Sequence, residues 1–238
     1  EKISFIDHAN APKTGSNFGG TYLFNLSVSD TQIGTMKFVN CDIKYKRGIC
    51  RIKTGADIDN FIIENCVIDS IGGYGVTNPD NGDADILNIK VTNSTFSHCE
   101  KLFVSTKPST KLINSFHAEN CTFAYNMKAG NNYMFDFNKM KFNNDPTLKN
   151  CIFGPGGHKG EAGAISGYRG EGSLIVDNCF ATKDIAWYIA EGSDVPSAPI
   201  EMDSTGADTN GTFENAASSN FKLLINDLKN VVGDPRWW

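Results

Sequence analysis

The chain has 238 residues, of which 40% are hydrophobic and 21% charged, which is typical of a globular protein rather than a disordered one. Its formal net charge of −5 argues against a nucleic-acid partner, because a phosphate-binding surface needs an excess of basic residues. The sequence contains no apolar run long enough to span a membrane and no secretion signal after Glu1, so we expect no transmembrane span in this chain.

Six segments align with one another around an Asn-Cys or Asn-Ser pair. In chain order they are MKFVNCDI (36–43), FIIENCVI (61–68), IKVTNSTF (89–96), FHAENCTF (116–123), PTLKNCIF (146–153) and LIVDNCFA (174–181). Successive asparagines are 25, 28, 27, 30 and 28 residues apart. A period in the twenties indicates a solenoid.

The apolar pattern of each segment slips by one position at the asparagine. Phe61 and Ile63 alternate as in a half-buried strand, but the next apolar residue after the Asn-Cys pair is Ile68. Asparagine tolerates the left-handed backbone conformation better than other non-glycine residues. We therefore predict that the chain turns a sharp corner at Asn40, Asn65, Asn93, Asn120, Asn150 and Asn178.

The residue after each asparagine is small and is expected to point inward. Stacked coils would place these side chains in a ladder just inside the corner. Its members are Cys41, Cys66, Ser94, Cys121, Cys151 and Cys179. Because seven cysteines cannot all pair within the chain, and none lies in a CxxC pair or at zinc-ligand spacing, the sequence favours neither a disulfide framework nor a metal site for them.

A corner repeated in every coil is typical of a parallel β-helix, whose coils stack about 4.8 Å apart. We predict an all-β fold, a single-stranded right-handed parallel β-helix with about six or seven coils and Asn and Cys ladders, over residues 1–186. A leucine-rich repeat also has an Asn/Cys ladder, but the leucines that its unit needs are missing here.

A second strand is expected after each corner, in GICRIK (48–53), GYGVTN (73–78), KLFVST (101–106), YMFDFN (133–138) and GAISGY (163–168). Variable loops lie between these strands and the corner strands: NPDNGDAD (78–85), TKPSTK (106–111), NMKAGNN (126–132) and GPGGHKGE (154–161). Loops on a rigid scaffold carry function, so we expect any site to lie among them.

Residues 187–238 form a C-terminal extension that we expect to pack on the β-helix and to cover an open end or side of it. The apolar spacing predicts a short helix ended by Gly233 and Pro235, although a strand starting at Phe221 fits as well. The apolar positions are Phe221, Leu224, Ile225, Leu228 and Val231.

The Asn-Cys corner repeat resembles that of the right-handed parallel β-helix (pectate-lyase-like) superfamily. GTFENAASSNFKLL (211–224) followed by VGDPRWW (232–238) resembles the C-terminal GDPRW signature of Bacteroides-type β-helix domains of unknown function. Those domains are secreted or outer-membrane lipoproteins that often occur beside glycan-utilisation genes. The resemblance implies a secreted or outer-membrane location, a lipid anchor upstream and a polysaccharide partner, but no particular reaction.

A pectate-lyase-like lyase would need a Lys or Arg base, together with Ca²⁺ or Arg to neutralise a uronate carboxylate. Asp80, Asp83 and Asp85 offer hard oxygen ligands for Ca²⁺, although a solvated turn is the favoured explanation. CEKLFVSTKPS (99–109) resembles the Glu…Lys segment of alginate and chondroitin lyases, in which Lys is the base. This resemblance makes Glu100, Lys101 and Lys107 the catalytic candidates, with a solvated charged rim as the alternative.

Further residues are candidates for substrate binding. GICRIKTG resembles the Arg-Ile-Lys segment of polygalacturonase-type hydrolases, but the other elements of those enzymes are absent, so Arg51 and Lys53 are read as outward strand residues. Asp136 lies between aromatic residues, and Tyr168 and Arg169 lie in a Gly-rich loop suited to glycan contact.

Two functions follow from these observations. We expect a non-catalytic, surface-exposed or secreted β-helix protein that binds or presents polysaccharide in a glycan-utilisation context. The alternative is a pectate-lyase-like polysaccharide lyase that acts on a uronate-containing glycan by β-elimination. We expect a monomer that needs no cofactor, with Ca²⁺ as the cofactor of the alternative.

Overall fold

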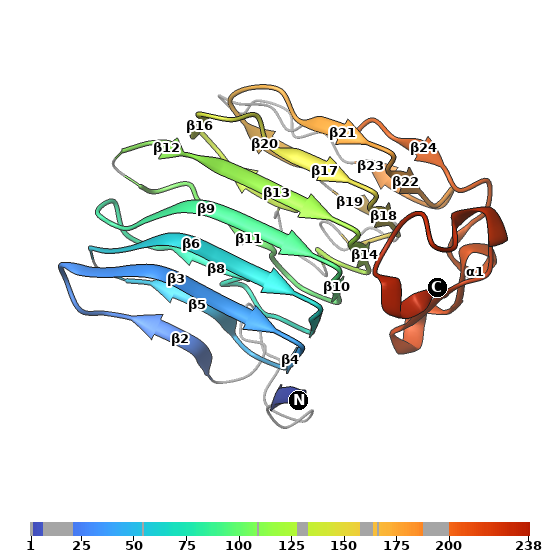
Figure 1. The fold of residues 1–238 in the computed structure, drawn as a ribbon, viewed down its shortest axis with the longest axis horizontal. Coiled ribbons are helices and arrows are strands. Elements are labelled where there is room, and N and C mark those ends of the chain that lie inside the picture. Colours follow the sequence, from blue (N-terminus) through green and yellow to red (C-terminus); the bar gives the residue numbers. More distant parts are fainter. Residues whose placement is uncertain are drawn as a thin grey trace.

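Each asparagine of the repeat turns the chain. Asn40, Asn65, Asn93, Asn120, Asn150 and Asn178 have φ between 49° and 55° in the computed structural model, which is the left-handed region. The structure describes residues 2–6, 21–53, 55–108, 110–127, 133–157, 164–165, 167–187 and 200–238. Consecutive coils wind into an all-β parallel solenoid, as the repeat predicts (Figure 1).

Three parallel sheets run along the stack. The front sheet, which faces the viewer in Figure 1, consists of β3 (Thr31–Val39), β6 (Ala56–Glu64), β9 (Asp85–Thr92), β13 (Ser115–Glu119), β17 (Thr147–Lys149) and β21 (Ile175–Asp177). The back sheet consists of β2 (Tyr22–Leu26), β5 (Gly48–Ile52), β8 (Thr77–Pro79), β11 (Phe103–Val104), β15 (Phe135–Phe137) and β20 (Tyr168–Gly170).

The third sheet has eight strands and lies just after the asparagine corner. Its strands are β1 (Ile3–Ile6), β4 (Cys41–Lys44), β7 (Val67–Asp69), β10 (Thr95–Ser97), β14 (Thr122–Ala124), β18 (Ile152–Phe153), β22 (Phe180–Ala181) and β24 (Asp203–Ser204). Two short parallel pairs join β12 (Leu112–Ile113) to β16 (Lys141–Phe142) and β19 (Ala164–Ile165) to β23 (Ala186–Trp187). The solenoid makes about five turns, slightly fewer than the six or seven coils predicted.

The predicted asparagine and cysteine ladders are confirmed. Asn120, Asn150 and Asn178 each donate a side-chain hydrogen bond to the asparagine of the preceding coil, over 3.0, 3.2 and 2.8 Å. Inside the corner, the Cys66 backbone N–H donates to the Ser94 hydroxyl over 3.0 Å, so Ser occupies the cysteine slot. All seven cysteines are free and buried. The ladder therefore satisfies corner backbone groups rather than forming disulfides.

A second left-handed corner closes four strands of the eight-stranded sheet, β4, β7, β10 and β14. Tyr45, Ser70, His98 and Tyr125 have φ between 53° and 58°, and each lies five residues after a ladder asparagine. The sequence does not mark this corner with one residue type, because Tyr, Ser and His all occupy it. These four strands are thus bounded on both sides by turns, which explains their length of three or four residues.

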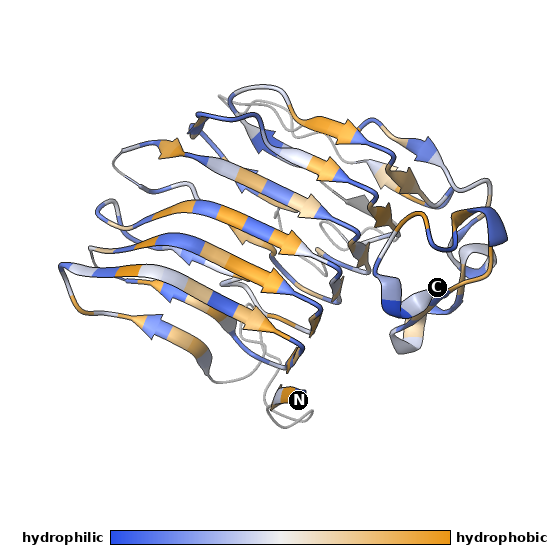
Figure 2. Ribbon diagram, in the orientation of Figure 1, coloured by the Kyte–Doolittle hydropathy of each residue, from blue (hydrophilic) through white to orange (hydrophobic). Residues whose placement is uncertain are grey.

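Aromatic and branched side chains fill the interior. Figure 2 shows apolar and polar residues alternating along the front strands, as expected for strands with one buried face. Phe96, Phe123 and Phe153 stack from coil to coil, with ring centroids 5.1 and 5.0 Å apart. The stacking gives the middle of the solenoid a continuous apolar core.

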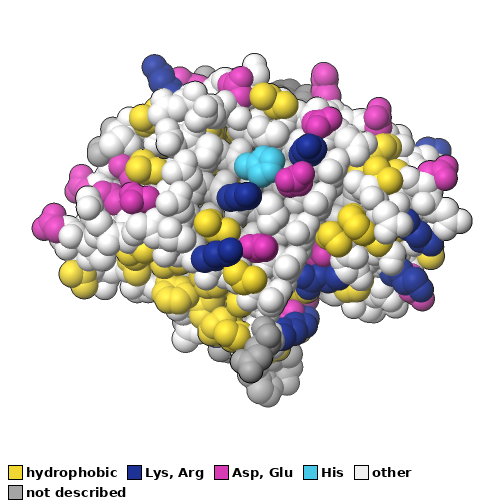
Figure 3. Space-filling view, viewed as in Figure 1, with side chains coloured by type: hydrophobic (Ala, Val, Ile, Leu, Met, Phe, Trp, Pro, Cys, Tyr) yellow, Lys and Arg dark blue, Asp and Glu magenta, His cyan; other side chains and the backbone are white. Residues whose placement is uncertain are grey.

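The outer face of the front sheet carries mixed charges. Basic, acidic and histidine side chains are interspersed over it in Figure 3. Lys37 pairs with Glu64 at 2.8 Å, and Glu119 lies 3.3 Å from His117 and 3.9 Å from Lys149. These exposed pairs are typical of a solvated surface and contribute little to stability.

The C-terminal segment packs against the side of the solenoid, on the outer face of the eight-stranded sheet (Figure 1). Parallel pairing first continues past residue 186 to β24, which pairs with β22. The segment then comprises α1 (Thr209–Thr212), β25 (Phe213–Asn215), η2 (Ala216–Ser218), β26 (Asn220–Leu223), η3 (Asn226–Leu228) and η4 (Pro235–Trp237). At Phe221 the strand alternative holds and the predicted helix is wrong, because β26 pairs antiparallel with β25.

The GDPRW stretch (233–237) attaches the C-terminal segment to the eight-stranded sheet. Gly233 has φ of +77°, and a Cβ there would lie 2.9 Å from Ile152 Cγ2, so only glycine fits. Asp234 accepts a hydrogen bond from the Thr95 hydroxyl, and its backbone N–H donates to Thr122 Oγ1.

No helix in the described part of the chain has the length and hydropathy that crossing a bilayer requires.

Candidate ligand-binding face

The outer face of the back sheet gathers most of the residues that the sequence marks as candidates. Asn25, Arg51 and Asn78 are register partners on β2, β5 and on β8. Further along the axis, Val104, Asp136 and Arg169 are register partners on β11, β15 and β20. Because Cys50 and Ile52 on either side of Arg51 are fully buried, alternation directs Arg51 outward, as predicted.

Asp80 joins three successive coils of this face. Its carboxylate accepts hydrogen bonds from Arg51, with Nε at 3.1 Å, and from the Lys107 ammonium. Partial burial alone would raise the pKa of Asp80, but the hydrogen bonds from Lys107 and Arg51 outweigh it and lower that pKa. We call Arg51, Asp80 and Lys107 the first ionic cluster.

Two tyrosines and a second arginine pack on the first ionic cluster. The Arg51 and Arg47 guanidinium carbons lie 4.6 and 4.7 Å from the centroid of the Tyr74 ring. Tyr22 packs edge-on against Tyr74, and its hydroxyl accepts a hydrogen bond from Arg51 over 3.2 Å. Such cation–π contacts hold the guanidinium groups in place. The sequence does not identify Tyr22, Arg47 and Tyr74 as members of this site, because no spacing pattern connects residues from three different segments.

Asp136 and Arg169 form a second ionic cluster further along the axis. Arg169 binds Asp136 in a bidentate pair, with both N···O distances 2.8 Å. The Arg169 guanidinium also lies over the Tyr133 ring, with its carbon 3.9 Å from the centroid. Burial raises the pKa of Asp136, although the Arg169 charge opposes this shift. The two clusters therefore present fixed, partly buried charges on one face.

The remaining candidates are placed differently. Lys53 is exposed after β5, and Glu100 and Lys101 are half-buried before β11, with the Lys101 charge acting on Asp136. Tyr168 does not lie on the outer face: register pairs it with the inward Phe135, and its side chain is buried. Alternation puts neighbouring residues on opposite faces, so Tyr168 and Arg169 cannot both face solvent.

The structure does not assemble a Ca²⁺ site from Asp80, Asp83 and Asp85. The Asp80 carboxylate already binds the side chains of Arg51 and Lys107. Asp85 accepts a hydrogen bond from the Thr110 hydroxyl over 2.9 Å. Burial and the nearby Asp57 raise the pKa of Asp85. Across the described ranges, no three His, Cys, Asp or Glu side chains lie close enough together to hold a metal ion.

The predicted loops are described in part. Pro79, Asp80 and Lys107 belong to the first two of these loops and lie at the edge of the back sheet. Residues 128–132 and 158–161 of the other two loops lie outside the described residues, as do His8 and His158.

A protein family described as "Domain of unknown function (DUF5123)" matches residues 116–237, just over half of the chain. The chain belongs to the DUF5123 family. Searches of curated proteins and of solved structures gave no match. The DUF5123 match runs from β13 to η4 and so includes the Asp136–Arg169 pair and the C-terminal segment. The first ionic cluster lies before it along the chain.

Proposed function

We propose that this protein binds or presents polysaccharide, without catalysis, through the outer face of the back sheet. The observation that carries the proposal is the pair of ionic clusters on this face, Arg51 with Asp80 and Lys107, and Asp136 with Arg169. Coils repeat about every 4.8 Å, so a linear polymer lying along the axis would meet charged and hydrogen-bonding groups at successive coils. The ion pairs fix these groups before any ligand arrives, which reduces the entropic cost of binding.

The resemblance to pectate-lyase-like β-helix domains supports a glycan partner and a secreted or outer-membrane location. A lyase would require a basic group free to take the proton next to the uronate carboxylate. The Lys107 ammonium contacts Asp80, Arg51 is bound to the same carboxylate, and Arg169 is bound to Asp136. Because the candidate base Lys107 and both arginines are held by carboxylates, the arrangement favours binding over elimination.

The test is retention of the full chain in affinity gels that contain uronate or neutral polysaccharides. We expect retardation by at least one uronate polysaccharide, and loss of it in Arg51→Ala and Arg169→Ala. Lys149→Ala is the matched control, because Lys149 is an exposed cation of the front sheet. Retardation that survives both arginine variants, or no retardation by any glycan, would refute the proposal.

The same polysaccharides are followed by ultraviolet absorbance for unsaturated products, with and without Ca²⁺. We expect no product. Turnover that disappears in Lys101→Ala or Lys107→Ala would show that the protein is a lyase instead.

A further inference from the structure

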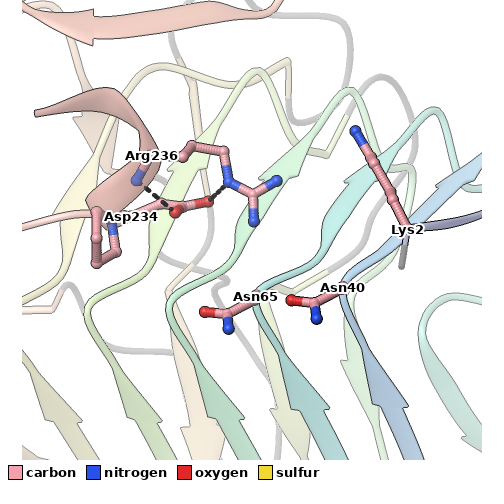
Figure 4. A pocket seen from close by; sticks show the side chains of 6 residues that line it. Lys2, Asn40, Asn65, Asp234 and Arg236 are labelled. Carbon is pink, nitrogen blue, oxygen red and sulfur yellow. Dashed lines mark hydrogen bonds and ion pairs between the residues drawn. The ribbon is translucent and has the colours of Figure 1, made fainter.

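A pocket of about 430 Å³ lies where the asparagine corners meet the C-terminal segment, away from the back sheet. Its lining residues are Lys2, Asn40, Asn65, Asp234, Pro235 and Arg236 (Figure 4). Ligand pockets in proteins commonly enclose about 300–1,000 Å³, so this one is large enough for a single sugar residue.

Arg236 is held rigidly at the edge of the pocket. Its Nε lies 2.7 Å from Asp234 Oδ2, and its backbone N–H donates to Asp234 Oδ1 over 3.1 Å. The Asp234 side chain is only 2% exposed and also accepts the Thr95 hydroxyl hydrogen bond, so both of its oxygens are already hydrogen-bonded. The two Nη groups of Arg236 have no hydrogen-bond partner among the described residues, and Figure 4 shows the guanidinium directed towards Asn65.

The asparagine ladder is interrupted at this pocket. From Asn93 to Asn178 the side-chain amides are hydrogen-bonded to one another, coil to coil. Asn40 and Asn65 lie side by side in Figure 4, yet neither amide has a side-chain hydrogen bond within the described ranges. Each of these amides therefore offers an unused donor and an unused acceptor.

We propose that this pocket binds a sugar residue that bears a carboxylate. The free Nη pair of Arg236 matches a carboxylate, which guanidinium groups bind in a bidentate manner. The amides of Asn40 and Asn65 suit hydroxyl groups, because an amide both donates and accepts. Lys2 adds a positive charge at the pocket edge, partly neutralised by its ion pair with Asp42 at 2.7 Å. This site is distinct from the ionic clusters of the back sheet and does not depend on them.

The experiment is a titration of the ¹⁵N-labelled full chain with galacturonate, galactose and acetate, followed by NMR. We expect galacturonate to shift the side-chain amide signals of Asn40 and Asn65 and to saturate. Galactose and acetate should each bind at least about tenfold more weakly, since each lacks one half of the recognised chemistry.

Variants locate the interaction. Arg236→Gln should weaken galacturonate binding by about tenfold or more, which is the loss expected for a hydrogen-bonded charge pair. Because this change also removes the contact with Asp234, Asn65→Gly provides an independent test. Glycine keeps the left-handed corner and deletes only the amide, so binding should weaken severalfold. Asn120→Gly is the matched control, because Asn120 belongs to the same ladder but lies outside the pocket.

The proposal is overturned if galacturonate does not bind, or if binding is unchanged in both Arg236→Gln and Asn65→Gly. It is also overturned if acetate or galactose binds as tightly as galacturonate, which would leave only a general anion or sugar contact. Arg51→Ala and Arg169→Ala should leave galacturonate binding in this pocket unchanged. The experiment can therefore refute this pocket without refuting polysaccharide binding by the back sheet, and the reverse.

Discussion

The indole N–H of Trp237 donates to the hydroxyl of Thr95 over 2.7 Å, although 142 positions separate these residues in the chain. The same hydroxyl donates to Asp234, so it accepts from one residue of the C-terminal segment and donates to another. Thr95 lies on β10, in the middle of the eight-stranded sheet. The last residues of the chain are thus tied to the centre of the solenoid rather than to its end.

Thr95→Val should therefore destabilise the protein. Valine has the shape of threonine but leaves the Asp234 carboxylate and the Trp237 N–H without this partner. We expect a loss of roughly 1–3 kcal/mol, measured as the free energy of unfolding in urea. Thr147→Val is the control, because among the described residues the Thr147 hydroxyl makes only a local hydrogen bond, to Asp145 O. Equal stability of Thr95→Val and the wild type would mean that this contact does not hold the segment.

Asn120→Ala should remove two inter-coil hydrogen bonds and put alanine in the left-handed region. We expect a loss of about 1–3 kcal/mol in the free energy of unfolding. Asn120→Gly loses the same hydrogen bonds but accepts the backbone conformation, so its loss should be smaller. If alanine at several ladder asparagines left stability unchanged, the role assigned to the corners would be wrong.

The cysteines should be unreactive while the protein is folded. All seven are buried, and burial raises the pKa of both Cys50 and Cys66 to about 12. A thiol reacts as the thiolate, which these groups do not form near neutral pH. Labelling with a chromogenic disulfide should be negligible in buffer and complete in denaturant. Rapid labelling of any one cysteine in the native protein would contradict the ladder as described.

The first ionic cluster should make stability depend on pH in the acid range. The pKa of Asp80 is lowered in the folded protein, so its contribution is fully present above the unfolded value of 3.8 and is lost as pH falls through the folded pKa. Asp80→Asn should lower the melting temperature at pH 7, and this difference from the wild type should shrink below about pH 4.

Asp83→Asn is the control for that measurement, since Asp83 forms no ion pair with any residue that the structure describes. A difference between wild type and Asp80→Asn that stays constant from pH 7 to pH 2 would show that the ion pairs with Arg51 and Lys107 do not stabilise the fold.

The fold was predictable because one residue pair marks the same place in each coil. The Asn65-Cys66 pair recurs in four other segments and as Asn93-Ser94 in a fifth, and the slip in apolar alternation reveals the corner. The second corner was not predictable, because no single residue type marks it: Tyr45, Ser70 and His98 all adopt the left-handed conformation there. Their backbone is set by the strands on either side, which is a tertiary effect.

The candidate site was predictable only in outline. Alternation identifies Arg51 as outward-facing. The pairing of Asp136 with Arg169 depends on the register between β15 and β20, which is set by the number of residues in the coil that joins them. The same alternation would have placed Tyr168 inside, had the strand expected at 163–168 been extended through Arg169 to Gly170, where β20 ends. The pocket at Arg236 brings together both ends of the chain, and no local pattern reports such a contact.

The left-handed asparagine corner also makes the coil a modular unit. Spacing between corners varies from 25 to 30 residues, while the pairing on both sides of the corner stays in register. Differences in length are therefore absorbed in the loops, which are free to diverge without disturbing the stack. Duplicating one complete coil, such as residues 93–119, would lengthen the solenoid by about 4.8 Å and add a new set of surface side chains. Growth by whole coils would let such a scaffold match ligands of different length.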